Sequence, residues 1–135
     1  MATLKVAVVT PERAMMRGEV DMVVAPSAMG QVGIMPQHQP LLADLEAGSV
    51  ILKKGDKVDV YAISGGFLEV DREQVTILAE TAERSADIDA DRAKKALADA
   101  EAKLKTLDVA SPEYVEESAR AKRAAVRLHV GTGGQ

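Results

Sequence analysis

Residues 58–70 read Val58-Asp59-Val60-Tyr61-Ala62-Ile63-Ser64-Gly65-Gly66-Phe67-Leu68-Glu69-Val70. Alternating apolar side chains on both sides of a glycine-rich turn are typical of two short β-strands. Further runs of this kind occupy residues 4–8, 20–24, 50–52 and 75–78. Turn residues separate the later runs at intervals of about eight to ten residues, which predicts a hairpin meander in a sandwich or barrel. No helix fits between these runs, so a parallel α/β fold is not expected.

The first fifty residues carry weaker strand signals. Arg17-Gly18 predicts a break before the run at residues 20–24, and Gly30-Gln31-Val32-Gly33 predicts a turn. The prolines of Met35-Pro36-Gln37-His38-Gln39-Pro40 predict a rigid extended loop. Such a loop is either a simple connection between strands or a contact surface for a partner, and both interpretations stand.

The composition changes near residue 85 from Val, Ile and Gly to Ala, Lys, Glu, Asp and Leu. One set of apolar residues is spaced alternately by four and three, which predicts one face of a helix. This set is Ala93, Leu97, Ala100, Leu104 and Leu107. Asp87 and Asp89 are both candidates for the N-cap of this helix.

Ser111-Pro112-Glu113 has the residue types of an N-cap, a first helical position and a first-turn acid, so it predicts a second helix. The expected apolar stripe of this helix is Tyr114, Ser118, Ala121, Ala125 and Leu128. Two helices joined by a short loop form an antiparallel hairpin. The expected organisation is a β domain over residues 1–84, a helical hairpin over 85–130 and a flexible tail over 131–135.

Composition excludes several classes of protein. The chain has 135 residues, no cysteine and only 2% aromatic residues, and its formal net charge is -4. Disulfide scaffolds and thiolate metal sites are therefore excluded, and neither His38 nor His129 belongs to a metal-ligand spacing, so no metal site is expected. An acidic chain with few aromatics is not expected to bind nucleic acid. No apolar run reaches the roughly 20 residues that cross a bilayer, and no export signal is expected.

The net charge conceals a basic segment. Residues 1–84 contain 8 basic and 12 acidic residues, residues 85–117 contain 5 and 9, and residues 118–135 contain 4 and none. Arg120, Arg123 and Arg127 lie three and four residues apart and form one helical stripe. This stripe is a solvated face, or it pairs with the acidic first helix, or it is a binding surface for a phosphate-bearing ligand or an acidic protein.

No catalytic arrangement emerges from the sequence. Ser64 lacks the first glycine of a nucleophile elbow, and Gly30-Gln31-Val32-Gly33 lacks the glycines and the lysine of nucleotide-binding loops. A small hydrolase is therefore not expected, and neither is any catalytic residue.

Several segments together resemble the epsilon subunit of bacterial F-type ATP synthase. They are Thr10-Pro11-Glu12, Pro36-Gln37-His38-Gln39-Pro40-Leu41, Ser64-Gly65-Gly66-Phe67-Leu68-Glu69-Val70 and Val75-Thr76-Ile77-Leu78-Ala79-Glu80. The resemblance covers almost the whole chain. It implies a flattened ten-stranded β-sandwich followed by an antiparallel two-helix hairpin.

The resemblance also implies a function and partners. The family's sandwich sits at the foot of the rotor against the gamma subunit and the c-subunit ring, at the cytoplasmic face of the bacterial inner membrane. It couples ring rotation to ATP synthesis without catalytic residues of its own, and the extended hairpin contacts the catalytic β subunits and inhibits ATP hydrolysis. The residues expected to bind partners are Gln31, Met35, His38, Arg120, Arg123 and Arg127. Some relatives carry an acid at the position of Gln31, so this contact with the c ring is expected to depend less on salt.

Several members of the family bind ATP through an I-D-x-x-R-A motif and basic residues of the second helix. The corresponding residues are Glu83, Ile88, Asp89, Arg92, Ala93, Arg123 and Arg127. Strong ATP binders have an arginine at the position of Asp99, and an anion there repels polyphosphate. We therefore expect at most a weak, regulatory ATP site and no required cofactor, or a motif that serves packing alone. The alternative function is a nucleotide-sensing module whose main output is ATP binding.

Overall fold

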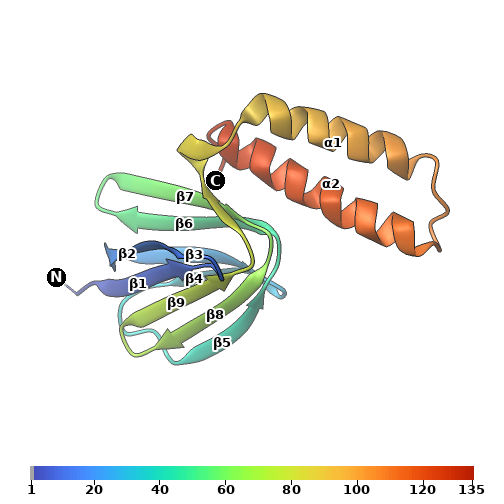
Figure 1. Cartoon of the computed structure of the whole chain (residues 1–135). Helices are drawn as coiled ribbons and strands as arrows, with labels where there is room; N and C mark the ends of the chain where they lie inside the picture. The colour runs from blue at the N-terminus through green and yellow to red at the C-terminus, as the bar shows by residue number, and fades with distance from the viewer. Residues whose placement is uncertain (1) are drawn as a thin grey trace.

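Ten β-strands precede two helices in the computed structural model, which describes residues 2–135 (Figure 1). The strands are β1 Leu4–Val9, β2 Ala14–Val20, β3 Met22–Ser27, β4 Gly30–Ile34, β5 Leu41–Leu45, β6 Gly48–Lys54, β7 Lys57–Ile63, β8 Gly66–Asp71, β9 Gln74–Ala79 and β10 Ala82–Arg84. A single 3₁₀ turn, η1 (Ser85–Asp87), leads to the helices α1 (Ala90–Leu104) and α2 (Pro112–Gly131). The β-sandwich and helical hairpin expected from the sequence are confirmed.

The strands form one sheet that folds over itself into two layers. Its order is β10-β7-β6-β3-β5-β8-β9-β1-β2, with β4 paired to β3. The sheet folds between β3 and β5, which share only the Ser27–Leu45 pair. All pairings are antiparallel except that of β1 with β9. Large aliphatic side chains fill the space between the layers, among them Leu4, Ile34, Leu52, Leu68 and Ile77.

The connection at Ser64-Gly65-Gly66 differs from the predicted hairpin turn. Both edges of β7 are already hydrogen-bonded, to β6 and β10, so β8 pairs with β5 and β9 instead. The connection therefore carries the chain from one layer to the other. Gly66 has φ +152°, and a Cβ on it would overlap the carbonyl oxygen of Leu78, so a side chain is not tolerated there.

Two predictions in the first fifty residues are wrong. Arg17-Gly18 does not break the chain but lies inside β2, and the break falls at Asp21. The carboxylate of Asp21 accepts a hydrogen bond from the N–H of Gly55 at 2.7 Å, which fixes the change of direction. Gly30-Gln31-Val32-Gly33 is not a turn but most of β4, because the turn lies at residues 28–29.

The predicted starts of both helices are confirmed. Asp89 is the N-cap of α1 and accepts a hydrogen bond from the N–H of Arg92 at 3.1 Å, whereas Asp87 lies in η1. Ser111 caps α2 through the N–H of Tyr114 at 3.3 Å. The predicted apolar face of α1 is confirmed from Ala93 to Leu104, where its four residues are buried or partly buried. The prediction is wrong for Leu107, which lies beyond the end of the helix.

The predicted stripe of α2 is wrong at one position. Ala125 is exposed, and Ala124 is buried in its place. Both alanines lie at helical spacing from Ala121, so periodicity alone does not distinguish them. The helix also includes Gly131, where the tail was expected to begin, and the N–H of Gly134 donates to the carbonyl of His129 at 2.8 Å.

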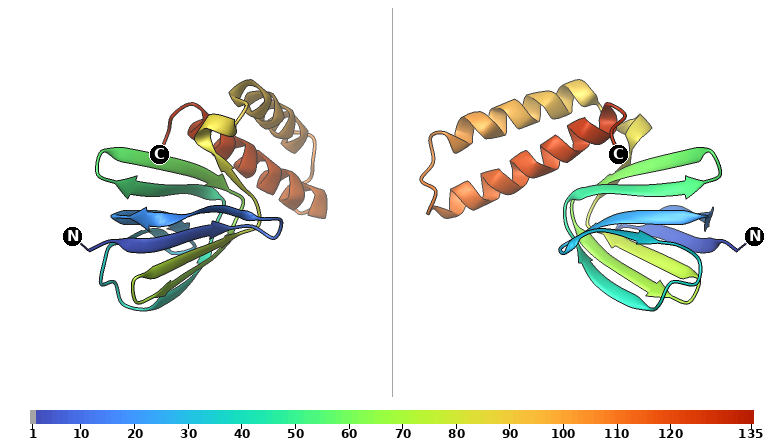
Figure 2. Two further views of the ribbon diagram at one scale, coloured as in Figure 1. Left: turned by 60° about the vertical axis from the view of Figure 1, so that its left-hand side comes forward. Right: turned by 180° about the vertical axis from the view of Figure 1, so that it is seen from behind.

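The hairpin projects from one end of the sandwich (Figure 2). In all three views α2 lies nearer the sandwich, α1 packs on its outer side, and the loop between them points away. The C-terminal end of α2 meets β6 and β7 through a second apolar cluster, which we call the junction cluster. Its members are Ile51, Val60, Ala62, Ile88 and Val130, with Val24 and Val126 packed against them. Within residues 2–135, no helix has the length and apolar character needed to span a membrane.

Candidate functional site

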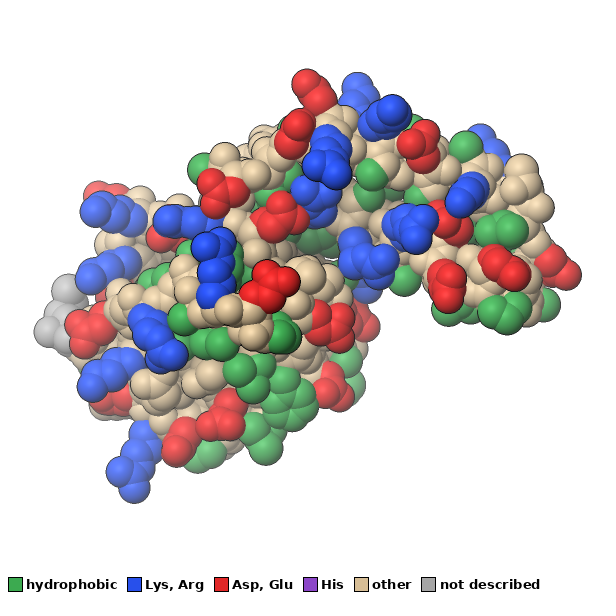
Figure 3. All heavy atoms as spheres, in the orientation of Figure 1, with side chains coloured by type: hydrophobic (Ala, Val, Ile, Leu, Met, Phe, Trp, Pro, Cys, Tyr) green, Lys and Arg blue, Asp and Glu red, His purple; other side chains and the backbone are tan. Residues whose placement is uncertain are grey.

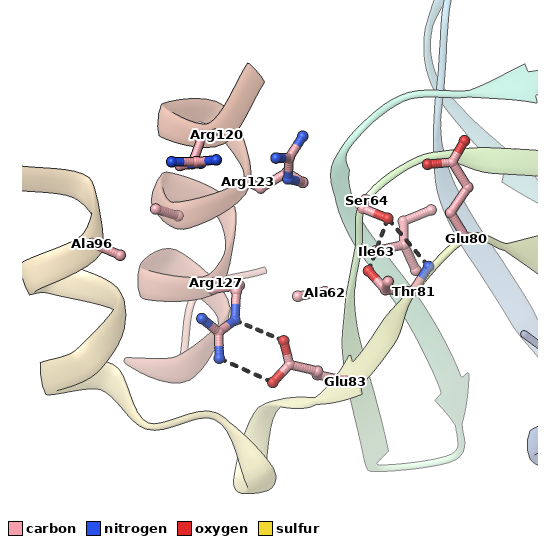
Figure 4. Close-up of a pocket in the computed structure, with 11 residues that line it drawn as sticks. Ala62, Ile63, Ser64, Glu80, Thr81, Glu83, Ala96, Arg120, Arg123 and Arg127 are labelled. Atoms are coloured by element: carbon pink, nitrogen blue, oxygen red, sulfur yellow. Dashed lines mark hydrogen bonds and ion pairs between the residues drawn. The ribbon is translucent and has the colours of Figure 1, made fainter. Parts of the chain in front are cut away.

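A cavity of about 470 Å³ lies between α2 and the end of the sandwich that carries β7 and β10 (Figure 4). Its wall combines side chains from both domains. The lining residues are Ala62, Ile63, Ser64, Glu80, Thr81, Glu83, Ala96, Arg120, Arg123, Ala124 and Arg127. All three arginines of the basic stripe therefore face this cavity.

Arg127 joins the two domains. Its Nε donates to Oε1 of Glu83 at 2.6 Å, and its Nη2 donates to Oε2 at 3.2 Å. Glu83 belongs to β10, so this two-pronged pair links α2 to the sandwich. The two side chains are 30% and 36% exposed, so solvent screens the pair only in part.

The other two arginines differ in their partners. Nη1 of Arg120 donates to Oε1 of Glu117 at 3.2 Å, one turn earlier on the same helix. Arg123 has no carboxylate within 4.0 Å among the residues that the structure describes. The interpretation that the stripe pairs with acids of the first helix is therefore wrong. It pairs with the sandwich at Arg127 and with its own helix at Arg120.

The sandwich contributes hydroxyl groups and acids to the cavity. The Oγ of Ser64 accepts hydrogen bonds from the hydroxyl of Thr81 at 2.8 Å and from its N–H at 3.1 Å. Glu80 and Glu83 bring negative charge to the same wall. The arginines of α2 thus face the acids of the sandwich across the cavity, and an anionic ligand would compete with Glu83 for Arg127.

Only part of the expected ATP motif reaches this cavity. Glu83, Arg123 and Arg127 line it, whereas the I-D-x-x-R-A segment has structural roles elsewhere. Ile88 is buried in the junction cluster, and Asp89 caps α1. Ala93 is fully buried, and Arg92 is exposed. Asp99, in place of the arginine of strong binders, is exposed on α1.

The expected partner-binding residues of the sandwich lie on and beside β4. Gln31 is exposed on β4, and Met35 is 59% exposed in the loop that follows. His38 is half-buried, with its Nδ1 2.6 Å from the carbonyl oxygen of Gln39. Gln37 has φ +70°, so this loop turns sharply and is not extended as predicted.

An apolar patch lies on the outer face of β5, β8 and β9, beside the exposed acids Asp44 and Glu69 of the same face. It consists of Leu42, Phe67 and Leu78, which are 64%, 38% and 48% exposed. Phe67 lies directly opposite Leu78 in the β8–β9 register, and Figure 3 shows green side chains gathered over these strands. We call this set the outer patch. Clustered exposed apolar residues mark interaction surfaces.

Chemical groups for catalysis are scarce. No group of His, Asp or Glu side chains with the arrangement of a metal site occurs within residues 2–135. Burial raises the pKa of Tyr61, partly offset by the guanidinium of Arg84, which lies 5.9 Å from the centre of its ring. Tyr61 belongs to the sandwich core and not to the lining of the cavity.

Two family models together match almost the whole chain. Residues 3–85 match the ATP synthase Delta/Epsilon chain beta-sandwich domain, and residues 86–131 match the ATP synthase Delta/Epsilon chain long alpha-helix domain. The chain belongs to the ATP synthase delta/epsilon chain family. The two models meet between residues 85 and 86, within η1.

Curated relatives in this family are named ATP synthase epsilon chain. One from Halalkalibacterium halodurans is 46% identical over 130 residues, which are 96% of this chain and 98% of the relative. Another, from Syntrophotalea carbinolica, is 43% identical over 98% of this chain and 96% of its own length. These matches favour an ATP synthase epsilon chain over an independent nucleotide sensor.

Solved structures share the fold at low sequence identity. A chain of the Euglena gracilis mitochondrial ATP synthase matches with a TM-score of 0.82 and 23% identity over 93% of this chain and 79% of its own. A chain of the Tetrahymena thermophila mitochondrial ATP synthase central stalk and c-ring matches with a TM-score of 0.64 and 16% identity, over 94% and 93%. These two chains thus share the fold although most residues differ.

Sequence reasoning missed several residues of the site. Ser64 and Glu80 belong to segments that carry the family resemblance but were not predicted to line a site, and Thr81 belongs to no motif. Glu117 was also missed, although it lies four and seven residues before Ala121 and Ala124, on the buried face of α2. Comparing alternative stripes along α2 would have placed an acid at this buried position.

Proposed function

We propose that this chain is a non-catalytic rotor subunit of a bacterial F-type ATP synthase. In this role the sandwich binds the gamma subunit and the c-subunit ring and couples ring rotation to ATP synthesis. The hairpin opens when its helices separate from the sandwich and from each other, and in this extended form it contacts the catalytic β subunits and inhibits ATP hydrolysis. The chain is then a peripheral subunit at the cytoplasmic face of the inner membrane.

One observation carries this proposal: the hairpin is attached to the sandwich through a small junction. Within residues 2–135 the links between the two are the junction cluster and two ion pairs, Arg127–Glu83 and Lys122–Glu46. The Lys122–Glu46 pair spans 3.4 Å between half-exposed side chains and contributes little. A few aliphatic contacts and one stronger ion pair can break while the sandwich core stays intact.

Release of the hairpin changes the exposure of the basic stripe. Arg127 loses Glu83, and the walls of the cavity separate, so Arg123 and Arg127 become available together. Guanidinium groups at helical spacing suit the carboxylates of an acidic protein surface. This supports the catalytic β subunits as the partner of the extended hairpin.

The outer patch supports a separate, permanent contact. It lies on β5, β8 and β9, whereas the hairpin meets β6, β7 and β10. A partner on the outer patch is therefore compatible with either position of the hairpin. We assign gamma to the outer patch and the c ring to the neighbouring region of Gln31, Met35 and His38.

The inhibitory function is tested by deletion in the assembled complex. We expect removal of residues 86–135 to leave assembly intact and to increase ATP hydrolysis, because the outer patch remains and the basic stripe is lost. Unchanged hydrolysis by a fully assembled complex would refute the inhibitory role.

The docking function is tested on the sandwich. Phe67→Glu places a charge in the outer patch, so we expect co-purification with gamma to be lost. Val115→Glu is the matched control, because Val115 is an exposed apolar residue on α2, away from the outer patch, and the variant introduces the same charge. A second variant with Met35–Leu41 replaced by a Gly/Ser loop tests the c-ring contact, and retained binding to the c ring would remove that assignment.

We also propose weak regulatory ATP binding at the cavity. Arg123 and Arg127 would hold the phosphates, and Asp99 lowers the affinity by repulsion. Calorimetry with MgATP is expected to give weak or no heat for the natural chain and stronger binding for Asp99→Arg. Glu101→Arg is the control, because Glu101 is also exposed on α1 and its replacement by arginine makes the same change in charge. Equal heats of binding for the two variants would show that Asp99 does not determine the affinity for ATP.

A further inference from the structure

Glu117 is a buried acid at the contact between α1 and α2. Its residue is only 7% exposed, and its side chain is 10% exposed. The other fully buried positions of the two helices are Ala93, Ala100, Ala124 and Val130. A carboxylate therefore occupies a place where the hairpin otherwise buries small apolar side chains.

The two oxygens of Glu117 have unequal surroundings. Oε1 accepts a hydrogen bond from Nη1 of Arg120 at 3.2 Å and lies 3.7 Å from Nζ of Lys103 on α1. Oε2 is shielded from solvent and has no hydrogen-bond partner among the residues that the structure describes. One of its two acceptors thus loses water without gaining a donor.

The exposure of Lys103 and Arg120 decides whether Glu117 stabilises or destabilises the folded hairpin. The side chains of Lys103 and Arg120 are 66% and 61% exposed, so water screens their attraction for Glu117. They would keep their hydration if Glu117 were removed, so its removal leaves no buried cation unpaired. The desolvation of Oε2 is the larger contribution, because a buried acceptor without a partner opposes folding.

We propose that Glu117 is a built-in destabilising residue that keeps the folded hairpin ready to open. When the helices separate, both oxygens regain water, and this favours the open state relative to an apolar residue at the same position. The consequence for ATP hydrolysis rests on the proposed function, in which the open hairpin inhibits. The structural part of the proposal stands independently of that role.

The test uses hydrogen exchange on the full chain with Glu117→Met. Methionine keeps the helix propensity and the length of the side chain and fills irregular space. We expect the amides of α1 and α2 to exchange roughly three- to tenfold more slowly than in the natural chain, because a buried unpaired acceptor is removed. Glu116→Met is the matched control, since Glu116 is the exposed neighbour and the variant makes the same change in charge.

A second variant separates charge from packing. Glu117→Gln removes the charge and keeps the shape, so a smaller slowing in the same direction is expected. Faster exchange in Glu117→Met than in Glu116→Met would show that Glu117 holds the hairpin together, and it would overturn the proposal. Equal exchange in these two variants would overturn it as well.

Measurement on the assembled complex distinguishes this inference from the proposed function. If Glu117→Met slows exchange and also raises ATP hydrolysis, the proposal for Glu117 and the inhibitory role of the open hairpin are both supported. If exchange slows and hydrolysis stays unchanged, the proposal for Glu117 stands and the inhibitory role of the open hairpin fails.

Discussion

The sandwich and the hairpin bury very different side chains. The sandwich encloses Leu4, Ile34, Leu52, Leu68 and Ile77, all fully buried. The helices bury three alanines, one valine and one glutamate. Each large aliphatic side chain contributes roughly 1.5–3 kcal/mol when buried, and alanine contributes far less. The sandwich is thus a stable carrier, and the hairpin is a weakly held element that can move without unfolding its support.

Truncation of the sandwich core gives the largest expected effect. Leu68→Ala removes a fully buried side chain between the layers and is expected to lower the free energy of unfolding by about 2–5 kcal/mol. Leu42→Ala is the control, because Leu42 is 64% exposed on the neighbouring strand. Denaturant unfolding measures both variants, and equal losses would contradict the account of the core.

Truncation in the junction cluster is expected to affect only the hairpin. Val130→Ala removes two methyl groups from a fully buried site, so docking should weaken by about 2 kcal/mol. Hydrogen exchange in α2 should accelerate while the sandwich amides keep their protection. Val115→Ala, at a 67% exposed site of the same helix, should change little. Simultaneous loss of protection in both domains would show that they unfold as one unit.

The Arg127–Glu83 pair contributes less, because both side chains are partly solvated. Arg127→Gln should weaken docking of the hairpin by about 1 kcal/mol. Arg123→Gln removes the same charge from the same stripe without breaking an ion pair to the sandwich, so it should leave docking nearly unchanged. A double-mutant cycle with Glu83→Gln measures the coupling, and a value of zero would show that the pair does not hold the junction.

The Lys122–Glu46 pair gives the smallest expected effect. Its side chains are 53% and 52% exposed, so Lys122→Gln should change docking by less than about 0.5 kcal/mol. Docking measured at low and high salt gives a second check. If Lys122→Gln weakened docking as much as Val130→Ala does, charge and not the junction cluster would hold the hairpin on the sandwich.

The sequence predicted the elements better than their pairing. Alternation identified β7 and β8, and cap chemistry located Asp89 and Ser111. The hairpin assigned to Ser64-Gly65-Gly66 was wrong because the pairing of a strand depends on which neighbours occupy its edges. The edges of β7 are taken by β6, directly before it in the chain, and by β10, which follows only after β8 and β9. Local patterns contain no information about such competition.

The candidate site was predicted only in part, because local patterns do not show how the hairpin docks on the sandwich. Helical spacing brought Arg120, Arg123 and Arg127 to one face, and all three line the cavity. Spacing did not reveal that Glu83 binds Arg127, because that contact depends on how the hairpin docks. It also failed to separate Ala124 from Ala125, and so it did not find the buried Glu117.

The central claim is that the hairpin opens while the sandwich stays folded and that the open form inhibits ATP hydrolysis. A disulfide tests it, because the sequence contains no cysteine and a Cβ on Gly131 would lie 3.2 Å from Cβ of Ile88, so a shift of a few tenths of an ångström brings the two positions to disulfide geometry. Ile88→Cys combined with Gly131→Cys joins the start of α1 to the end of α2. In the assembled complex we predict high ATP hydrolysis in the oxidised form and restored inhibition after reduction, with each single variant insensitive to oxidation. Full inhibition in the oxidised, cross-linked complex would contradict the account.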